Sequence, residues 1–326
     1  MKILIIESHN YSKKAISIYK KIGKIYLLKD FKRSKINSYK NKFKDIDILV
    51  VRDRVLVDKK MIELMPKLKV VASPTTGLNH IDTDFLKKNR IKLISLRGRK
   101  KFLKNITSTS EHAMALLLSL IRHIPWSFND VKNSEWPRDI YIGNQLKDKT
   151  LGILGYGRLG KIFKKYAKAF GMNIIASDPH VSKKQMAKDG VKKVSMNDLF
   201  KKSDIISLHV LLTQDTFDLV KNDHLKLMKN NSFLINTSRG EIIEEGALYK
   251  ALSNKWLRGA AIDVMRDERN DGSHLKNNDL VKYAKGHDNL IITSHLGGVS
   301  YEAMEETENF VADLVKSYII KKRIKK

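Results

Sequence analysis

The chain alternates short apolar runs with longer polar stretches along most of its length. In residues 1–100 the apolar runs are KILIIE, KIYLL, DILVVR, VVAS and IKLISL. Polar stretches that are compatible with helices, such as residues 12–21 and 59–65, separate these runs. Short continuous apolar runs are typical of strands that are buried on both faces, and the intervening stretches supply the helices that cover them. The pattern therefore predicts a parallel sheet with helices on both faces.

A second alternating series begins at Thr150, with the apolar runs TLGILG, MNIIASD, DIISLH, SFLINT, GAAIDV and LIITSH. Between the two series, residues 107–122 predict a long apolar helix, and residues 125–147 lack clear periodicity and are interpreted as a loop or arm. Residues 300–320 have helical apolar spacing. A length of 326 residues is sufficient for two α/β domains, each with its own core.

Composition adds one unusual property, a formal net charge of +28. Such a charge is compatible with nucleic acid, a membrane surface or anionic small molecules as partners. Basic residues recur along the whole chain, with denser runs only at residues 97–104 and 321–326, which favours solvated lysine faces over a dedicated patch. The remaining consequence would be electrostatic steering of anionic substrates. Because no nucleic-acid-binding motif is apparent, we expect no specific nucleic-acid partner.

The chain contains no cysteine, which excludes disulfides, thiolate metal ligands and a cysteine nucleophile. No apolar stretch approaches the roughly 20 residues that a membrane helix requires. The apolar residues 3–6 near the start are too few for a signal peptide and predict a first strand. We therefore expect a cytoplasmic protein with no metal site and no membrane partner.

A glycine-rich loop leaves one apolar run and opens a predicted helix. It consists of Gly155, Tyr156, Gly157, Arg158, Leu159 and Gly160. Gly155 would permit the tight turn, Gly157 the approach of a pyrophosphate to backbone N–H groups, and Gly160 the packing of helix on sheet. Asp178 ends the next apolar run, where it could bind a ribose 2′-hydroxyl and repel a 2′-phosphate. The loop predicts a dinucleotide site that prefers NAD to NADP, although a glycine turn with a capping aspartate is the alternative.

Three polar residues follow apolar runs in the second series. They are Arg239 after LINTS, Glu268 after AAIDV, and His295 after LIITS. A carboxylate beside an imidazole raises the imidazole pKa toward neutral pH, and a guanidinium can hold a carboxylate and polarise a carbonyl. Taken singly, each residue also fits a surface cap, a solvated loop or a satisfied histidine. Together with the dinucleotide loop, the three predict hydride transfer to or from a carboxylate-bearing alcohol.

Seven motifs follow one another in a specific order. They are TTGLNHID at 75–82, STSEHAMALLL at 108–118, LGILGYGRLG at 151–160, SDIISLHVLLTQDT at 203–216, MKNNSFLINTSRGEIIEEGAL at 228–248, AAIDVMRDE at 260–268 and TSHLGG at 293–298. In this order, from about residue 49 to 303, the chain resembles the D-isomer-specific 2-hydroxyacid dehydrogenases. The resemblance implies two doubly wound parallel-sheet domains, Rossmann-like or flavodoxin-like, with the active site in the cleft between them.

The resemblance also implies how the chain is divided and what each part binds. Residues 1–103 with 298–326 would form a discontinuous substrate-binding domain, and residues 104–297 would bind NAD and carry the contacts of a homodimer. His295 would exchange the hydroxyl proton, Glu268 would hold its imidazole, and Arg239 would bind the substrate carboxylate and carbonyl. Substrate contacts are implied at Arg52, Arg54, Thr76, Gly77 and Leu78. Further cofactor contacts are implied at His209, Thr237, Asp263, Gly297 and Gly298.

Departures from the family pattern leave the substrate open. Arg52 and Arg54 stand where phosphoglycerate dehydrogenases of the family carry phosphate-binding arginines, but Asp53 between them replaces the usual serine. A phosphoglycerate-type substrate and an unphosphorylated one, as in hydroxypyruvate or glyoxylate reductases, therefore remain alternatives. The usual prolines are replaced by Leu211, Arg269 and Ser294.

The end of the chain and one relative of the family suggest two further expectations. The sequence ends soon after the last predicted helix, which implies a short form without the C-terminal regulatory domain of longer phosphoglycerate dehydrogenases. Formate-dehydrogenase-like activity is disfavoured, because that branch carries glutamine where this chain has Glu268. The alternative from another class of protein is an NAD-sensing binding protein similar to a transcriptional corepressor.

Overall fold

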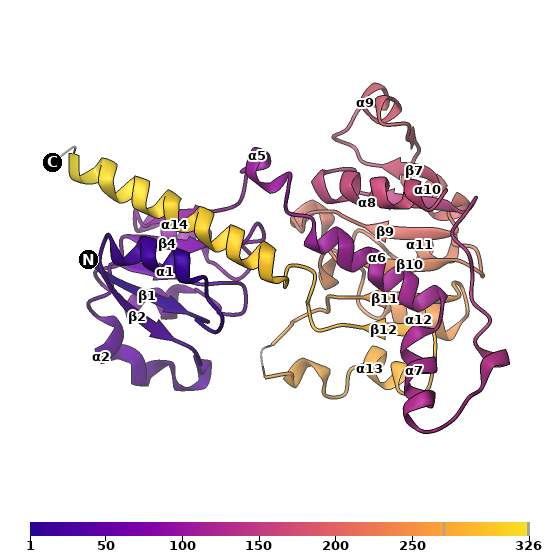
Figure 1. Ribbon diagram of the computed structural model, residues 1–326, viewed down its shortest axis with the longest axis horizontal. Coiled ribbons are helices and arrows are strands. Elements are labelled where there is room, and N and C mark those ends of the chain that lie inside the picture. Colours follow the sequence, from indigo (N-terminus) through magenta and orange to yellow (C-terminus); the bar gives the residue numbers. More distant parts are fainter. Residues whose placement is uncertain (270, 325–326) are drawn as a thin grey trace. The chain divides into compact units, whose positions relative to one another are not determined.

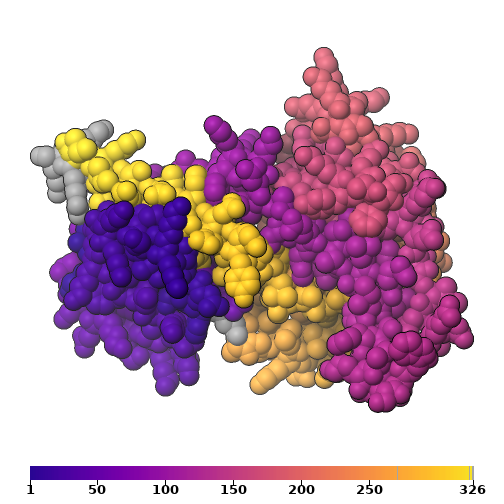
Figure 2. Space-filling view, viewed as in Figure 1, coloured from indigo at the N-terminus to yellow at the C-terminus, as the bar shows by residue number. Residues whose placement is uncertain are grey.

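The chain divides into two compact units in the computed structural model, which describes residues 1–269 and 271–324 (Figure 1, Figure 2). Unit 1 contains Met1–Ile106 and Ser300–Lys326, and unit 2 contains Thr107–Val299. The sequence predicts these divisions at 103/104 and 297/298, a few residues earlier in each case.

Unit 1 contains a parallel sheet of five strands in the order β2-β1-β3-β4-β5. The strands are β1 (Lys2–Ile6), β2 (Lys24–Leu28), β3 (Ile48–Val50), β4 (Val70–Ser73) and β5 (Lys92–Ser95). Ile3 and Ile5 pack into one apolar cluster, whereas Leu4 and Ile6 pack into another on the opposite face. Successive side chains of a strand point to opposite faces, so burial on both faces makes β1 continuously apolar.

The helices of unit 1 cover both faces of this sheet. They are α1 (Lys13–Lys20), η1 (Arg33–Tyr39), α2 (Lys40–Phe43), α3 (Lys59–Glu63), α4 (Thr83–Lys88), α5 (Lys100–Leu103) and α14 (Tyr301–Ile324). Helices α1 and α14 lie side by side on one face (Figure 1). Val311 and Val315 of α14 are fully buried in the cluster that contains Ile3 and Ile5. The last helix therefore completes the core that the first hundred residues begin.

Unit 2 contains a parallel sheet of seven strands in the order β12-β11-β10-β9-β6-β7-β8. The strands are β6 (Thr150–Leu154), β7 (Asn173–Ser177), β8 (Lys192–Lys193), β9 (Ile205–Leu208), β10 (Phe233–Asn236), β11 (Gly259–Ile262) and β12 (Leu290–Ile292). The chain adds β7 and β8 on one side of β6 and the remaining strands on the other. The strand order therefore reverses beside β6, and the carboxyl ends of strands at such a point form the usual ligand crevice of an open α/β sheet.

The helices of unit 2 surround its sheet (Figure 1). They are α6 (Ser108–Ile121), α7 (Ile124–Lys132), η2 (Arg138–Ile140), α8 (Arg158–Ala169), α9 (Lys183–Lys188), α10 (Met196–Lys202), η3 (Gln214–Thr216), α11 (Asn222–Lys226), η4 (Gly240–Ile242), α12 (Ala247–Ser253), η5 (Ser273–Leu275) and α13 (Asp279–Ala284). Helix α6 confirms the predicted apolar helix. None of the helices in residues 1–269 and 271–324 combines the length and apolarity needed to cross a membrane.

The prediction of a loop or arm for residues 125–147 is wrong for its first part, which forms α7. Pro125 stands in the first turn of this helix, where a proline costs no hydrogen bond. No residue of α7 is buried, and Phe128 is 65% exposed. The helix therefore lacks the apolar stripe by which a helix facing a core is recognised.

Candidate active site

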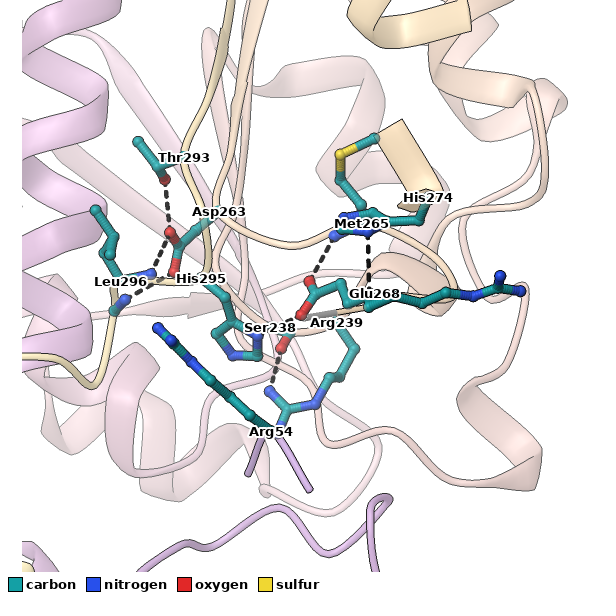
Figure 3. A network of polar contacts seen from close by, with 12 residues as sticks. Arg54, Ser238, Arg239, Asp263, Met265, Glu268, His274, Thr293, His295 and Leu296 are labelled. Atoms are coloured by element: carbon teal, nitrogen blue, oxygen red, sulfur yellow. Dashed lines mark hydrogen bonds and ion pairs between the residues drawn. The ribbon is translucent and has the colours of Figure 1, made fainter. Parts of the chain in front are cut away.

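Arg239, Glu268 and His295 lie in the loops that follow β10, β11 and β12. These three parallel strands are neighbours in the sheet of unit 2. Their carboxyl ends therefore meet at one edge of the sheet, and the three side chains lie in one region (Figure 3). The structure thus brings together three residues that the sequence separates by dozens of positions.

The side chains of His295 and Glu268 form a hydrogen-bonded pair. His295 Nδ1 lies 2.6 Å from Glu268 Oε2, and the two side chains are 30% and 32% exposed. The other carboxylate oxygen, Oε1, accepts the backbone N–H of Met265 at 2.8 Å. Because an ionised carboxylate can only accept hydrogen bonds, it orients the imidazole with its proton on Nδ1. Proton exchange with a substrate would then run through Nε2.

Asp263 holds the backbone around His295. Its carboxylate accepts hydrogen bonds from the Thr293 hydroxyl at 2.6 Å and from the backbone N–H groups of Leu296 at 2.7 Å and Gly297 at 2.8 Å. This support matters because His295 has a φ of 59°, a left-handed conformation that costs a histidine energy.

Asp263 is also bonded to helix α6 and remains charged in its buried position. His112 Nε2 lies 3.1 Å from its Oδ1, and only 1% of Asp263 is exposed. Burial acts to raise the pKa of Asp263, but the hydrogen bonds from His112, Thr293 and the two backbone N–H groups outweigh it and lower the pKa. The loop that carries His295 is therefore fastened to a buried charge.

Arg239 follows a turn that the side chain of Asn236 organises. The Asn236 amide accepts the Ser238 N–H at 3.0 Å and donates to the Arg239 carbonyl at 3.0 Å. The Arg239 guanidinium donates to the Ser238 carbonyl at 2.6 Å, and no carboxylate of the described residues forms an ion pair with it. The guanidinium therefore keeps hydrogen-bonding capacity for an anionic ligand.

The glycine loop lies at the reversal of strand order, between β6 and α8. Gly155 has a φ of 90°, and a Cβ there would lie 2.7 Å from the backbone of His209. A Cβ on Gly160 would lie 2.4 Å from the Gly155 carbonyl oxygen, whereas a Cβ on Gly157 would meet nothing within 4 Å. Two glycines thus permit close packing within the protein, and the third faces open space at the start of α8. This arrangement fits a pyrophosphate bound at a helix N-terminus.

Asp178 fastens the same loop. One carboxylate oxygen accepts the Tyr156 N–H at 2.8 Å, and the other accepts the His180 N–H at 2.8 Å. Two further predicted cofactor residues follow β9 and β10: burial lowers the pKa of His209 to about 4, and Thr237 is 6% exposed. His209 Nδ1 and Thr237 Oγ1 have no hydrogen-bond partner among the described residues. The ends of β9 and β10 therefore contain a neutral histidine and a hydroxyl with unused hydrogen-bonding capacity.

In unit 1, the guanidinium of Arg52 binds a carboxylate and a backbone carbonyl of the protein. Its Nε and Nη2 donate to Glu308 Oε1 at 2.8 and 2.5 Å, and its Nη1 donates to the His9 carbonyl at 3.0 Å. The guanidinium also lies over the ring of Tyr11, 5.2 Å from its centre. Glu308 is 1% exposed and belongs to α14, and its second oxygen accepts the Ser12 N–H at 2.7 Å. The ion pair therefore fastens α14 to the end of β3.

Glu7 holds the segment that contains the other predicted substrate arginine. It accepts the backbone N–H groups of Arg52 at 3.0 Å and Arg54 at 3.2 Å. Burial, followed by the nearby charge of Asp53, raises the pKa of Glu7 to about 7. Thr76, Gly77 and Leu78 lie in the loop after β4, where Thr75 Oγ1 donates to the Gly77 carbonyl at 2.8 Å.

Sequence reasoning assigned no role to four residues that organise these regions: Glu7, His112, Glu308 and Arg266, which forms an ion pair with Asp218 and donates to the Ile243 carbonyl. His112 lies inside the quoted motif STSEHAMALLL, and Arg266 lies inside AAIDVMRDE, so a signal existed for both. Glu308 lies in a helix whose apolar positions alone were considered. A charged residue on the buried face of a predicted helix was the signal that could have identified it.

Comparison with known proteins agrees with these features. The family model "D-isomer specific 2-hydroxyacid dehydrogenase, NAD binding domain" matches residues 114–297. D-3-phosphoglycerate dehydrogenase of Methanocaldococcus jannaschii is 35% identical over 306 residues, which are 94% of this chain and 55% of that protein. Glyoxylate reductase of Thermococcus litoralis is 34% identical over 319 residues, which are 96% of this chain and 92% of that protein. The chain thus spans about half the length of the first relative.

A solved structure gives the same result for the fold. D-lactate dehydrogenase of Aquifex aeolicus, complexed with NAD and lactic acid, has a TM-score of 0.81 and 26% identity, and the match covers 97% of this chain and 95% of that one. The chain therefore belongs to the D-isomer specific 2-hydroxyacid dehydrogenase family. The predicted family and the two parallel α/β sheets are confirmed.

Proposed function

We propose that this protein is an NAD-dependent dehydrogenase that interconverts a D-2-hydroxy acid and its 2-oxo acid by hydride transfer. The observation that carries the proposal is the His295–Glu268 pair, 2.6 Å apart at the strand edge that also holds Arg239. An acid–base pair beside a guanidinium matches what a hydroxy acid requires: one group to exchange the hydroxyl proton and another to hold the carboxylate. Family membership supports the same reaction.

Each catalytic side chain has a role that follows from its contacts. In the direction of reduction, the doubly protonated ring of His295 donates its Nε2 proton to the substrate carbonyl oxygen, and Glu268 keeps the remaining proton on Nδ1. Arg239 binds the substrate carboxylate and polarises the carbonyl. NADH, when bound, supplies the hydride to the carbonyl carbon. The protein thus contributes position, charge and one proton.

The cofactor residues are proposed on the same basis. The open space at Gly157 would accept the pyrophosphate, and Asp178 would bind the ribose 2′-hydroxyl and repel the extra phosphate of NADP. His209, Thr237, Gly297 and Gly298 remain proposed contacts. A nicotinamide contact at Asp263 would add a donor to a carboxylate that already accepts four. Its contribution through the His295 loop is therefore the better supported of its two roles.

A small unphosphorylated 2-oxo acid, such as glyoxylate or hydroxypyruvate, is the favoured substrate. Arg52 is committed to Glu308, and the adjacent segment contains the carboxylates of Glu7 and Asp53, which disfavour a phosphate. The proposed contacts of unit 1 with the substrate are then Arg54 and the backbone N–H groups of Thr76, Gly77 and Leu78. A phosphoglycerate-type substrate is the second candidate, because the relative from Methanocaldococcus jannaschii carries that name.

Consumption of NADH with a panel of 2-oxo acids tests the proposal. The panel contains glyoxylate, hydroxypyruvate, pyruvate and 3-phosphohydroxypyruvate, with NADPH in parallel. The proposal predicts turnover of glyoxylate or hydroxypyruvate above that of the phosphorylated acid, and a preference for NADH. Binding of NADH without turnover of any acid would instead support the alternative of an NAD-sensing binding protein.

We also propose that unit 2 forms a homodimer through the segment that begins with α7. Several large apolar side chains of this segment are exposed: Ile124 by 51%, Phe128 by 65%, Trp136 by 82%, Ile140 by 67% and Ile142 by 74%. The segment lies on the surface of unit 2 (Figure 2). Several exposed apolar side chains in one segment are typical of interaction sites in soluble proteins. Sedimentation of the wild type and of Phe128→Glu/Trp136→Glu tests this, with Leu211→Glu, another exposed apolar position, as control.

A cytoplasmic location is proposed as well, because a dehydrogenase of this kind needs access to the cellular NAD pool. Fractionation of cells that express the chain tests this directly. Recovery with the membrane fraction would contradict it.

A further inference from the structure

We propose that Arg266 is a positioning residue for the acid–base pair, because its guanidinium fastens the turn that carries Glu268 to two neighbouring loops of unit 2. The inference rests on the proposed function of the His295–Glu268 pair. The two loops, residues 217–220 and 241–245, are called the loop pair below.

The loop pair is held together by its own backbone. Asp218 N donates to the Glu241 carbonyl, Val220 N to the Ile242 carbonyl, and Glu244 N to the Val220 carbonyl, each at 2.9 Å. Val220 and Ile242 are fully buried. Backbone pairing over a buried apolar base gives a rigid support, because opening it would expose apolar area and leave amide groups without partners.

Arg266 reaches both members of the loop pair with one side chain. It forms an ion pair with Asp218, its Nε donates to the Ile243 carbonyl at 3.2 Å, and the same atom lies 3.2 Å from Glu245 Oε2. The guanidinium also lies over the ring of Phe217, 5.1 Å from its centre. The arginine side chain is only 19% exposed, so these charge-assisted contacts are partly shielded from water.

Arg266 belongs to the short turn, residues 265–268, that aligns the Glu268 carboxylate. Met265 N donates to Glu268 Oε1 at 2.8 Å, and Asp267 has a φ of 51°, so the segment is a tight turn with one left-handed residue. A Cβ on Gly240, directly after Arg239, would lie 2.4 Å from Arg266 N. The segments that present Arg239 and Glu268 therefore meet at Arg266, and the side chain of this residue secures that junction.

Loss of the Arg266 side-chain contacts should lower kcat more than it weakens the binding of substrate or NADH. We expect the core of unit 2 to survive loss of the guanidinium, because the backbone pairing of the loop pair remains, whereas the direction of the Glu268 carboxylate depends on the turn. A displacement of the order of 1 Å in a catalytic group can lower the rate roughly 100-fold. We expect Arg266→Gln to lower kcat about 10-fold or more, with KM and the Kd for NADH changed by less than about 2-fold.

The experiment compares four variants with the wild type: Arg266→Gln, Arg266→Lys, Asp218→Asn and the double variant Arg266→Gln/Asp218→Asn. Asp223→Asn is the matched control, since Asp223 lies in the neighbouring helix α11, is 93% exposed, and pairs only with Lys226 among the described residues. The ¹⁵N resonances of the His295 ring report its tautomer without any substrate, and His295→Gln assigns them. Steady-state kinetics give kcat and KM separately.

The proposal predicts that the Nδ1–H tautomer of His295 loses population in Arg266→Gln and in Asp218→Asn, with kcat lowered in parallel. The double variant should be little worse than Arg266→Gln alone, because that variant already removes the contact that Asp218→Asn removes. Arg266→Lys should recover part of kcat. An unchanged tautomer and kcat in folded Arg266→Gln, or an equal loss in Asp223→Asn, would overturn it. If the wild type reduces no 2-oxo acid, the tautomer measurement still decides the positioning role.

Discussion

Arg52 and Arg239 each follow a buried strand at the carboxyl edge of a parallel sheet, one in unit 1 and one in unit 2. The guanidinium of Arg52 is bound by a carboxylate that is 1% exposed, a backbone carbonyl and an aromatic face. The guanidinium of Arg239 donates to the carbonyl of its own neighbour, Ser238. One arginine therefore stabilises the fold, and the other keeps capacity for a ligand.

The same contrast extends to the acids near each arginine. In unit 1, Glu7 and Glu308 bind groups that belong to the framework: backbone N–H groups in one case and Arg52 in the other. In unit 2, Glu268 binds one backbone N–H group and directs its second oxygen to His295. A strand end becomes a candidate active site when the hydrogen bonds among its own polar groups leave some donors and acceptors available to a substrate.

The largest expected effect is that of His295→Gln. General acid–base catalysis contributes about 10²- to 10⁴-fold, so we expect kcat to fall by roughly 10³-fold or more. The Kd for NADH, measured by fluorescence titration, should stay within about 2-fold of the wild type, because the glycine loop is untouched. If turnover survives in this variant, the pair at the edge of unit 2 does not perform the proton transfer.

The second largest effect should be a loss of folding stability when the ion pair between Arg52 and Glu308 in unit 1 is broken. Arg52→Met leaves the buried carboxylate of Glu308 without its partner, which typically costs about 3 kcal/mol or more of folding free energy. The double variant Arg52→Met/Glu308→Leu should recover most of the loss. Lys59→Met, which removes an exposed ion pair with Glu63, is the control and should change stability by less than about 1 kcal/mol. Urea unfolding measures all three, and equal losses in Arg52→Met and Lys59→Met would contradict the contrast.

Glu7 gives a smaller effect that depends on pH. Its pKa is raised from 4.5 to about 7 when folded, so both states hold the proton at low pH and the unfolded state loses it first as the pH rises. The wild type should therefore lose up to about 3 kcal/mol of stability relative to Glu7→Gln between about pH 4.5 and pH 7. Unfolding at several pH values tests the sign. A difference between the two proteins that does not change with pH would show that Glu7 ionises normally.

The smallest expected effect concerns the choice of cofactor. Asp178→Asn keeps an acceptor for the Tyr156 N–H but removes the negative charge that would face a 2′-phosphate. The ratio of kcat/KM for NADPH to that for NADH should rise about 10-fold, which corresponds to about 1.4 kcal/mol. An unchanged ratio would assign the reading of the ribose to another residue.

The sheets and most helices could be predicted from the sequence because parallel strands buried on both faces are continuously apolar. Strand β8 was missed, since its two residues are both lysines, and α7 was missed because it buries nothing. Such elements exist through backbone pairing and local turn geometry, which leave no apolar pattern.

The candidate site also contains residues that the sequence could predict and residues that it could not. Arg239, Glu268 and His295 were predictable because each follows its own strand, and parallel neighbours place those strand ends together. The ion pair between Arg52 and Glu308 could not be predicted, because the two residues lie 256 positions apart in the chain. No local pattern shows that a guanidinium meets a carboxylate from a distant helix.

One measurement tests the contrast between the two arginines most directly: kcat/KM for the best 2-oxo acid in Arg239→Gln and in the stable pair variant Arg52→Met/Glu308→Leu. We predict a loss of roughly 10³-fold in Arg239→Gln, as expected when a charge-assisted contact with a substrate carboxylate is removed. The pair variant should stay within about 3-fold of the wild type, because its arginine serves the fold. A retained kcat/KM in Arg239→Gln, or an equal loss in the pair variant, would contradict the account.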